Sequence, residues 1–255
     1  MKKLSVAIIT LNEERNIGRC LESLHSLADE IVVLDSLSTD RTESICRDFG
    51  ARFERQPFAG HIRQKQDAID LCSYEMVLSL DADEALSDEL RNVILKEKQK
   101  DFPSFFYSMN RLTNYCGKWI YHCGWYPDTK LRLFDRRYAL MGGQNPHDKI
   151  IPTDSSLSVD HLQGDLLHYS YYNIEEHRQQ ANRFATIAAK AVASKGKNPS
   201  FAFAVFKAVA KFIRNYILKL GFLDGRYGWV ICRISAWETY QKYRRVGLFQ
   251  SKKSP

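Results

Sequence analysis

Short, continuously apolar segments alternate with helix-like segments through the first hundred residues of the chain. Three apolar runs have the character of strands, 6–10, 31–34 and 76–80, and residues 51–55 form a weaker candidate strand between them. Three segments with the apolar spacing of amphipathic helices separate them: 14–27, 39–49 and 62–72. Ser87 is placed to cap a further helix. Because a strand that is apolar along its whole length is covered on both faces, the pattern predicts an α/β fold with a mostly parallel sheet and helices on both faces.

The character of the chain then changes twice. Residues 104–170 are β-like and aromatic, and from Asn173 the pattern is helical. Asn173 and Glu176 have the spacing of a helix N-cap and its acidic partner. We therefore expect an α/β catalytic domain over 1–172 and a basic, amphipathic helical extension over 173–255.

Charge is distributed unevenly along the sequence. Residues 178–255 contain sixteen Lys or Arg and two Asp or Glu, a net charge of +14, whereas residues 1–177 contain 21 basic and 28 acidic residues, a net charge of −7. Such an asymmetry indicates a polyanionic partner, either a nucleic acid or an anionic membrane surface.

The apolar spacing within the basic region favours the membrane. Over 205–220 one helical face carries Val205, Phe212, Tyr216 and other apolar residues, and the cations lie largely off it. Such a helix suits a membrane interface, whereas a nucleic-acid surface would interleave aromatic residues with cations, so no nucleic-acid partner is expected. The alternative is a helix that packs its apolar face on its own domain and leaves a solvated basic side.

No membrane-spanning segment and no disulfide framework are expected. No run approaches the ~20 apolar residues that a membrane span requires. The apolar start of the chain ends in Asn12-Glu13-Glu14 without a cleavage site, which indicates a strand rather than a signal peptide. The six cysteines are expected to be reduced and structural. These features predict a cytoplasmic protein.

Acidic residues follow three of the predicted strands, at Glu13, Asp35 and Asp81. In open α/β sheets ligands bind at the carboxyl ends of strands. Asp81-Ala82-Asp83 places two carboxylates on one side of an extended backbone. Such a pair suits Mg²⁺ or Mn²⁺, which bind one or two carboxylates together with substrate phosphates. The alternative is a solvated turn whose acids cap the next helix.

Two other nucleotide-binding classes lack support. The sequence contains neither the Gly-x-Gly-x-x-Gly of a dinucleotide fold nor the Gly-x-x-x-x-Gly-Lys-Ser/Thr of a P-loop.

Three segments, in order, resemble family 2 glycosyltransferases, which have the Rossmann-like GT-A fold: 6–14, 32–42 and 80–84. The likeness extends into 124–134 and into Gly225 with the closing basic helix, where it is similar to bacterial lipopolysaccharide-core β-glucosyltransferases. The resemblance implies a nucleotide-sugar donor, a divalent metal and a heptose- or Kdo-linked acceptor at the cytoplasmic membrane.

The resemblance also implies roles for individual residues. Thr10, Asn12 and Glu13 would line the nucleoside pocket, and Asp35 would contact the base. Arg63 and Lys65 lie where the family supplies a cation near the nucleotide, although ordinary solvated helix charge is the alternative. Asp81 would face the ribose or a metal-bound water, and Asp83 would ligate the metal.

The candidate general base is Asp148, in the His147-Asp148 pair that follows the β-rich insert. It would deprotonate the acceptor hydroxyl, and the alternative is a turn Asp after Pro. His168 is either a further metal ligand or a hydrogen-bonded structural residue, and Arg132 is a candidate for binding the diphosphate or an acidic acceptor.

The sequence therefore predicts an inverting, metal-dependent transferase that uses UDP-glucose to build a glycolipid such as the lipopolysaccharide core. It would act as a peripheral protein on the inner face of the cytoplasmic membrane. One alternative is a transferase that uses UDP-galactose or UDP-N-acetylhexosamine in capsule or O-antigen assembly. Another is a non-catalytic basic module that binds membranes or nucleic acid on a sugar-nucleotide fold.

Overall fold

The computed structural model describes residues 2–144 and 147–250, and the chain forms two compact units. The first unit comprises Met1–Leu112 and Asp128–Tyr169, and the second comprises Thr113–Pro127 and Ser170–Pro255. The division near residue 170 lies close to the predicted boundary between 1–172 and 173–255. Residues 113–127 belong with the helices of the second unit.

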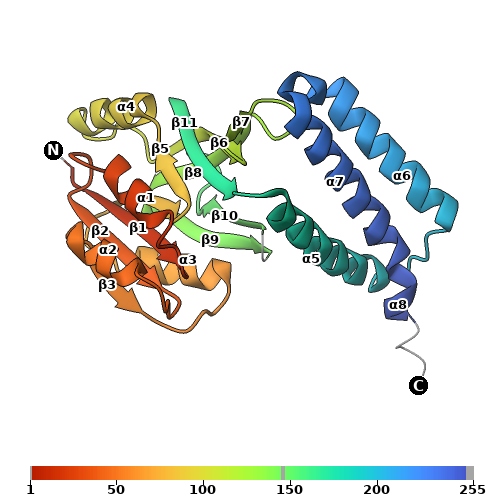
Figure 1. Ribbon diagram of the computed structural model, residues 1–255. Helices are drawn as coiled ribbons and strands as arrows, with labels where there is room; N and C mark the ends of the chain where they lie inside the picture. The colour runs from red at the N-terminus through yellow and green to blue at the C-terminus, as the bar shows by residue number, and fades with distance from the viewer. Residues whose placement is uncertain (1, 145–146, 251–255) are drawn as a thin grey trace. The chain divides into compact units, whose positions relative to one another are not determined.

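A mixed β-sheet forms the centre of the first unit (Figure 1). Its strands are β1 (Leu4–Thr10), β2 (Glu30–Asp35), β3 (Arg52–Arg55), β4 (Met76–Asp81), β5 (Glu84–Leu86), β6 (Phe106–Tyr115), β8 (Asp128–Asp135) and β11 (Val159–Tyr171). Strand β7 (Lys118–Ile120) pairs with residues 113–115 at the end of β6, and this pair belongs to the second unit. The strand order is β3-β2-β1-β4-β8-β6-β11-β5. A separate antiparallel hairpin joins β9 (Ala139–Gln144) and β10 (His147–Pro152).

The parallel part of this sheet is confined to β3, β2, β1 and β4. Strand β8 joins β4 in antiparallel orientation, and β5 joins β11 in the same way. Parallel neighbours require a crossover such as a helix, and a helix connects each strand from β1 to β4 with the next. The predicted α/β class is confirmed, with an antiparallel half supplied by the β-rich middle of the chain.

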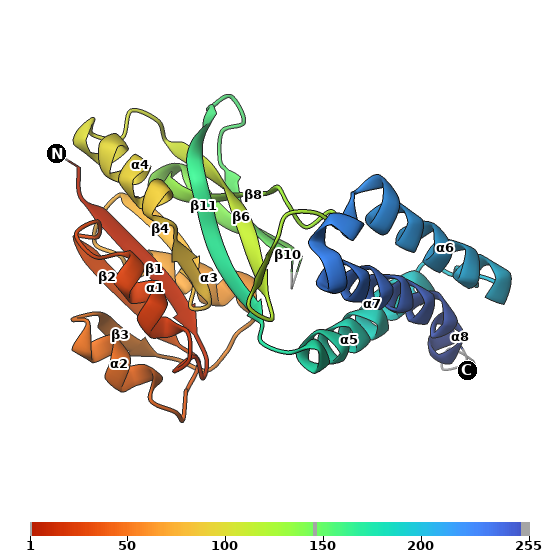
Figure 2. The same ribbon diagram turned by 45° about the horizontal axis from the view of Figure 1, so that its top comes forward.

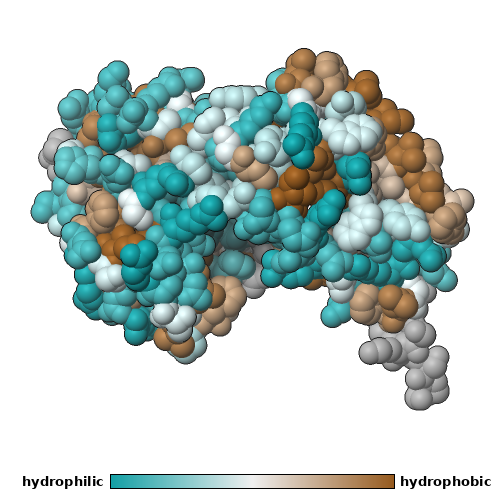
Figure 3. All heavy atoms as spheres, in the orientation of Figure 1, coloured by the Kyte–Doolittle hydropathy of each residue, from teal (hydrophilic) through white to brown (hydrophobic). Residues whose placement is uncertain are grey.

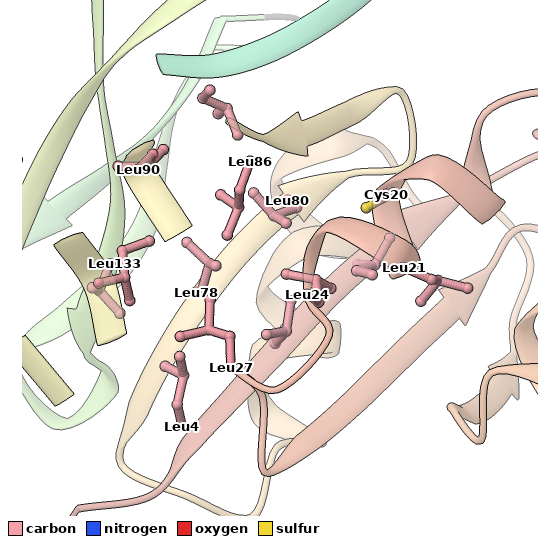
Figure 4. Close-up of a cluster of buried hydrophobic side chains, with 14 of the residues drawn as sticks. Leu4, Cys20, Leu21, Leu24, Leu27, Leu78, Leu80, Leu86, Leu90 and Leu133 are labelled. Atoms are coloured by element: carbon pink, nitrogen blue, oxygen red, sulfur yellow. The ribbon is translucent and has the colours of Figure 1, made fainter. Parts of the chain in front are cut away.

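Helices cover both faces of the sheet (Figure 2). They are α1 (Ile17–Ser23), α2 (Thr42–Asp48), α3 (His61–Asp70) and α4 (Asp88–Gln99). Residues of α1 and α4 join Leu78 and Leu80 of β4 in one buried cluster (Figure 4). Residues of α3 join Val77 in a second cluster. Because side chains alternate along a strand, neighbouring residues of β4 enter opposite clusters, which explains why apolar residues predominate on both sides of the strand.

The second unit is largely helical. Its elements are α5 (Ile174–Ala193), α6 (Phe201–Ile213), the π-helical turn η2 (Arg214–Leu218), the 3₁₀ turn η3 (Gly221–Asp224), α7 (Gly225–Arg244) and α8 (Val246–Gln250). A Cβ on Gly228 would lie 1.8 Å from the carbonyl oxygen of Gly221, so the close approach of α7 to η3 requires glycine there. Among the described residues no helix is long and apolar enough to cross a bilayer.

The buried carboxylate of Asp224 holds residues 113–127 in this unit. Its Oδ2 accepts a hydrogen bond from the backbone N–H of His122 (2.9 Å), and its backbone oxygen accepts one from Lys118 Nζ (2.7 Å). Asp224 is 2% exposed, and the bonds from the backbone N–H groups of Tyr121 and His122 satisfy a carboxylate that would otherwise be costly to bury. They explain why a segment from the middle of the chain packs with the late helices.

Two predicted helix starts are confirmed. The Ser87 side chain accepts a hydrogen bond from Leu90 N, and the Asn173 side chain accepts one from Glu176 N. The Glu176 carboxylate in turn accepts a bond from Tyr172 N at 2.8 Å. These contacts satisfy backbone donors that a helix leaves unpaired at its start.

Candidate active site

The predicted strand ends lie in register at one edge of the parallel sheet. Thr10 pairs with Asp35 of β2, and its neighbour Ile9 pairs with Asp81 of β4. The Thr10 hydroxyl oxygen is buried and has no hydrogen-bond partner within the described part of the chain. A buried donor without a partner carries a free-energy cost, which a hydrogen bond to a ligand would remove. Thr10 lies at the edge where open α/β sheets bind their ligands.

The Asp81–Asp83 turn is fixed by two backbone hydrogen bonds. The Asp81 N–H donates to Glu84 Oε2 at 3.0 Å, and the Asp83 carbonyl accepts from Tyr169 N at 2.9 Å. The Asp81 and Asp83 side chains are 27% and 26% exposed. The turn is thus anchored to β5 and β11, and both carboxylates remain partly accessible.

Lys65 joins Asp81 to Asp148. Its ammonium nitrogen lies 2.8 Å from Asp81 Oδ1 and 2.8 Å from Asp148 Oδ2. The lysine side chain is only 4% exposed, and that of Asp148 is 13% exposed. The structure therefore brings together two acids that are 67 positions apart in the chain, and it places Asp148 on strand β10.

Arg132 forms the other side of this cluster. Its guanidinium NH2 lies 3.0 Å from Asp81 Oδ2 and 2.7 Å from Glu84 Oε1. Burial opposes ionisation of Asp81, but the positive charges of Lys65 and Arg132 outweigh it and hold the pKa of this carboxyl well below its usual range. Asp81 is consequently an anion at any physiological pH.

Asp83 contacts His168, the histidine that the sequence predicts as either a metal ligand or a structural residue. His168 Nε2 lies 3.2 Å from Asp83 Oδ2, because β11 pairs with β5 and brings His168 opposite Glu84. No three His, Cys, Asp or Glu side chains of the described residues are arranged to hold a metal ion. The Asp83 carboxylate nevertheless fits Mg²⁺ or Mn²⁺, and the His168 imidazole fits Mn²⁺, since these ions take much of their coordination from phosphates and water.

The loops after β1 and β2 are tied to each other. Asn12 has a positive φ of 54°, and its N–H donates to Ser38 Oγ at 2.7 Å. The Asn12 side chain accepts from Thr39 N at 2.9 Å. Asp35 is fully buried and accepts hydrogen bonds from the Ser38 N–H and hydroxyl. The loops that carry the predicted nucleoside contacts are thus preorganised.

Glu13 lies in an acidic environment. Burial raises the pKa of Glu13, although a hydrogen bond from Asn16 Nδ2 (2.7 Å) opposes the change. The negative charges of Asp83, Asp40 and Asp81 raise this pKa further. Repulsion of this kind is relieved by a cation.

Arg63 is placed differently from Lys65. The Arg63 side chain is 70% exposed and forms an i,i+4 ion pair with Asp67 at 2.7 Å. An exposed pair of this kind contributes little to stability. Of the two cations predicted in this helix, Lys65 joins the carboxylate cluster, and Arg63 lies at the surface.

Three further residues, to which the sequence motifs assign no role, complete the cluster: Glu84, Arg111 and Asp128. Arg111 lies 2.8 Å from Asp128 and 3.4 Å from the fully buried Glu84. Glu84 accepts from Arg132, from Arg111 and from the Asp81 backbone, and so links the acidic turn to strands β6 and β8. Its place directly after Asp83 is the signal that could have identified it.

Curated relatives match nearly the whole chain. The lipopolysaccharide core biosynthesis glycosyltransferase LpsC of Rhizobium meliloti is 29% identical over 263 residues, which cover 94% of this chain and 93% of LpsC. An uncharacterized glycosyltransferase of Rickettsia typhi is 28% identical over 254 residues, covering 96% of this chain and 87% of that protein.

A solved structure gives a weaker match. Glucosyl-3-phosphoglycerate synthase of Mycobacterium tuberculosis, in complex with Mn²⁺, UDP and glucosyl-3-phosphoglycerate, is 25% identical over 44% of each chain, with a TM-score of 0.35. The family model of glycosyl transferase family 2 matches residues 5–153, more than half of the chain and nearly all of the strands and loops described above. The chain therefore belongs to glycosyl transferase family 2, and it is a glycosyltransferase.

Proposed function

We propose that this glycosyltransferase is an inverting, metal-dependent enzyme that moves a sugar, glucose from UDP-glucose, onto a glycolipid acceptor. The observation that carries the proposal is the Lys65 bridge. It brings the candidate base Asp148 next to Asp81, the first acid of the Asp-x-Asp turn. A donor held at that turn would have a carboxylate beside it to receive the acceptor's proton.

The donor's nucleoside is proposed to lie at the ends of β1 and β2. The buried Thr10 hydroxyl without a partner among the described residues supports this placement, and so do the linked loops around Asn12 and Glu13. Asp35 would meet the base once a ligand draws its carboxylate from Ser38. Lys65 and Arg132 would offer positive charge to the donor, with Arg63 at the rim.

Asp83 and His168 are the residues proposed to hold Mg²⁺ or Mn²⁺, and Asp81 would contact the ribose or a metal-bound water. The ion would neutralise charge on the departing diphosphate. The raised pKa of Glu13, caused by burial and then by neighbouring carboxylates, supports a cation at this place.

The chemical step needs one base. Asp148 would accept the proton of the acceptor hydroxyl while that oxygen forms a bond to the anomeric carbon. The bond from this carbon to the diphosphate oxygen would break on the opposite face, so the configuration inverts. A positioned base of this kind contributes a factor of about 10²–10⁴ to the rate.

The acceptor is proposed to be a lipopolysaccharide core or a similar glycolipid. LpsC, whose name places it in lipopolysaccharide core biosynthesis, matches 94% of this chain and supports this class. Such an acceptor would be met on the inner face of the cytoplasmic membrane, with the protein bound peripherally. UDP-galactose or UDP-N-acetylhexosamine in capsule or O-antigen assembly is the alternative donor set.

The proposal is tested by measuring UDP release with Mn²⁺ from UDP-glucose, UDP-galactose and UDP-N-acetylglucosamine, using extracted core glycolipid as the acceptor. Asp148→Asn is expected to lower acceptor-dependent turnover by about 10²–10⁴-fold while UDP binding is retained. Asp88→Asn makes the same change at a side chain that is 90% exposed and should leave turnover unaltered. Equal turnover in the two variants would exclude Asp148 as the base.

A further inference from the structure

Helix α6 turns its apolar side outward. The exposed residues of α6 are all apolar. Six of them follow one helical face at spacings of three and four: Ala202, Val205, Phe206, Val209, Ala210 and Ile213, and Phe201 and Phe203 are exposed at the start of the helix. The opposite side, with the buried Ala204, faces the unit's interior. A surface helix of a water-soluble domain normally shows the reverse pattern.

Part of the apolar face predicted over 205–220 is packed inside the second unit. Phe212 and Tyr216 are half-buried and pack on Trp229, with ring centroids 5.1 and 5.4 Å apart. Lys207 and Lys211 are half-buried as well. The alternative of a packed apolar face with a solvated basic side therefore does not describe this helix.

The exposed apolar surface continues around the corner that follows α6. Ile217, Leu218, Leu220 and Leu223 are 50%, 71%, 45% and 55% exposed, and Phe206 on α6 is 65% exposed. Figure 3 shows hydrophobic side chains gathered along the outer edge of α6 and this corner. We call the exposed apolar residues of 202–223 the apolar ridge. Contiguous apolar surface of this kind marks an interaction site.

The charges beside the apolar ridge are positive. Arg214, Lys219 and Arg226 are exposed, and residues 195–223 contain no Asp or Glu. Apolar side chains flanked by cations alone complement a bilayer whose headgroups are anionic. A second copy of this chain would bring the same positive charges against each other.

We infer that the apolar ridge inserts into one leaflet of an anionic bilayer, with α6 lying in the plane of the interface and the 217–223 corner reaching among the acyl chains. The inference deepens the proposed function, since a docked enzyme would meet a lipid-linked acceptor. Only the biological purpose of membrane insertion depends on the proposed function, and the insertion itself does not. Vesicle binding is measured without donor or acceptor, so either proposal can fail while the other stands.

The test is flotation of the full chain with vesicles of phosphatidylcholine alone and of phosphatidylcholine with phosphatidylglycerol. The wild type is expected to bind the anionic vesicles more tightly. It should also retain binding at about 1 M salt, where the screening length is about 3 Å, because the insertion is apolar. Phe206→Ser combined with Leu218→Ser should lower the partition coefficient about tenfold or more, since each change removes a large apolar side chain.

The matched control is Phe49→Ser, at a phenylalanine of the first unit that is 48% exposed and lies outside the apolar ridge. Its vesicle binding should equal that of the wild type, and both variants should keep the wild-type far-UV circular dichroism. Equal binding by the ridge variant and the control would overturn the inference. So would concentration-dependent dimers, seen by light scattering, that the ridge variant abolishes while vesicle binding is absent.

Discussion

Replacing Lys65 with methionine tests the ionic bridge at the centre of the site. Methionine keeps an unbranched stem of similar length and removes the charge. Asp81 would retain Arg132 at 3.0 Å, whereas Asp148 would lose its 2.8 Å ion-pair contact with Lys65 while only 13% exposed. Breaking a buried pair by removing one partner costs about 3–5 kcal/mol. Because Asp81 and Asp148 keep some solvent contact, we expect the free energy of unfolding to fall by about 3 kcal/mol, near the lower end of this range.

Urea unfolding followed by circular dichroism measures this loss. With an m value of about 3 kcal/mol/M, the midpoint should fall by about 1 M. Lys149→Met removes a charge at the exposed residue next to Asp148 in the chain and should change stability by less than about 0.5 kcal/mol. Equal midpoints for the two variants would refute the bridge.

The stability difference also has a defined pH dependence. The folded pKa of Asp81 is lowered by Lys65 and Arg132 against the opposing effect of burial. A lowered pKa contributes stability that is present above the unfolded value of about 3.9 and is lost as the pH falls through the folded value. The gap between the wild type and Lys65→Met should therefore be full at neutral pH and shrink below about pH 4.

Three further outcomes follow from the structure. Gly164→Ala should destabilise the first unit by about 2–4 kcal/mol in the same urea assay, because φ is +91° and the added Cβ would lie 2.5 Å from Leu90 N; an unchanged midpoint would contradict that packing. Asn173→Ala should cost about 1 kcal/mol through loss of the α5 cap, unlike the exposed Gln179→Ala. His168→Ala should raise the Mn²⁺ concentration for half-maximal UDP release at least about tenfold, and an unchanged value would remove His168 from the metal site.

Much of the fold follows from local pattern. Strands β1, β2 and β4 are largely apolar because both faces of the sheet are covered, whereas the edge strand β3 carries charged residues. Ser87 and Asn173 cap helices through bonds to residues three positions on. The pairing of β5 with β11 depends on tertiary contact, and so does the packing of 113–127 around Asp224. Neither leaves a periodic signal in the sequence.

The candidate site likewise has one part that the sequence predicts and another part that it does not. The carboxyl ends of parallel strands meet at one edge of the sheet, so the sequence predicts that residues following such strands lie together. These residues are Thr10, Asp35 and Asp81. The Lys65–Asp148 contact joins a helix to a late hairpin, and no spacing rule connects them. The position of Glu84 directly after Asp83 marks it as a candidate, but no local pattern shows that it is buried and bonded to Arg132 and Arg111.

The surface of the second unit shows another limit of periodicity. The helical spacing identified an apolar face on α6, but spacing cannot tell whether such a face is packed or exposed. Phe212 and Tyr216 turned out to pack on Trp229, whereas Phe206 is exposed. Burial depends on the neighbouring helix, so only the folded structure separates the two groups.

Calorimetric titration of UDP into the wild type and Asp83→Asn, each with and without Mn²⁺, shows whether the Asp81–Asp83 turn binds the donor's diphosphate through a metal ion. If Asp83 holds an ion that binds the diphosphate, Mn²⁺ should tighten UDP binding to the wild type. The factor by which Mn²⁺ increases UDP affinity should be at least about tenfold smaller in the variant. Asp88→Asn should behave as the wild type. UDP affinity that is the same with and without Mn²⁺, or the same in Asp83→Asn and the wild type, would contradict the proposed donor site.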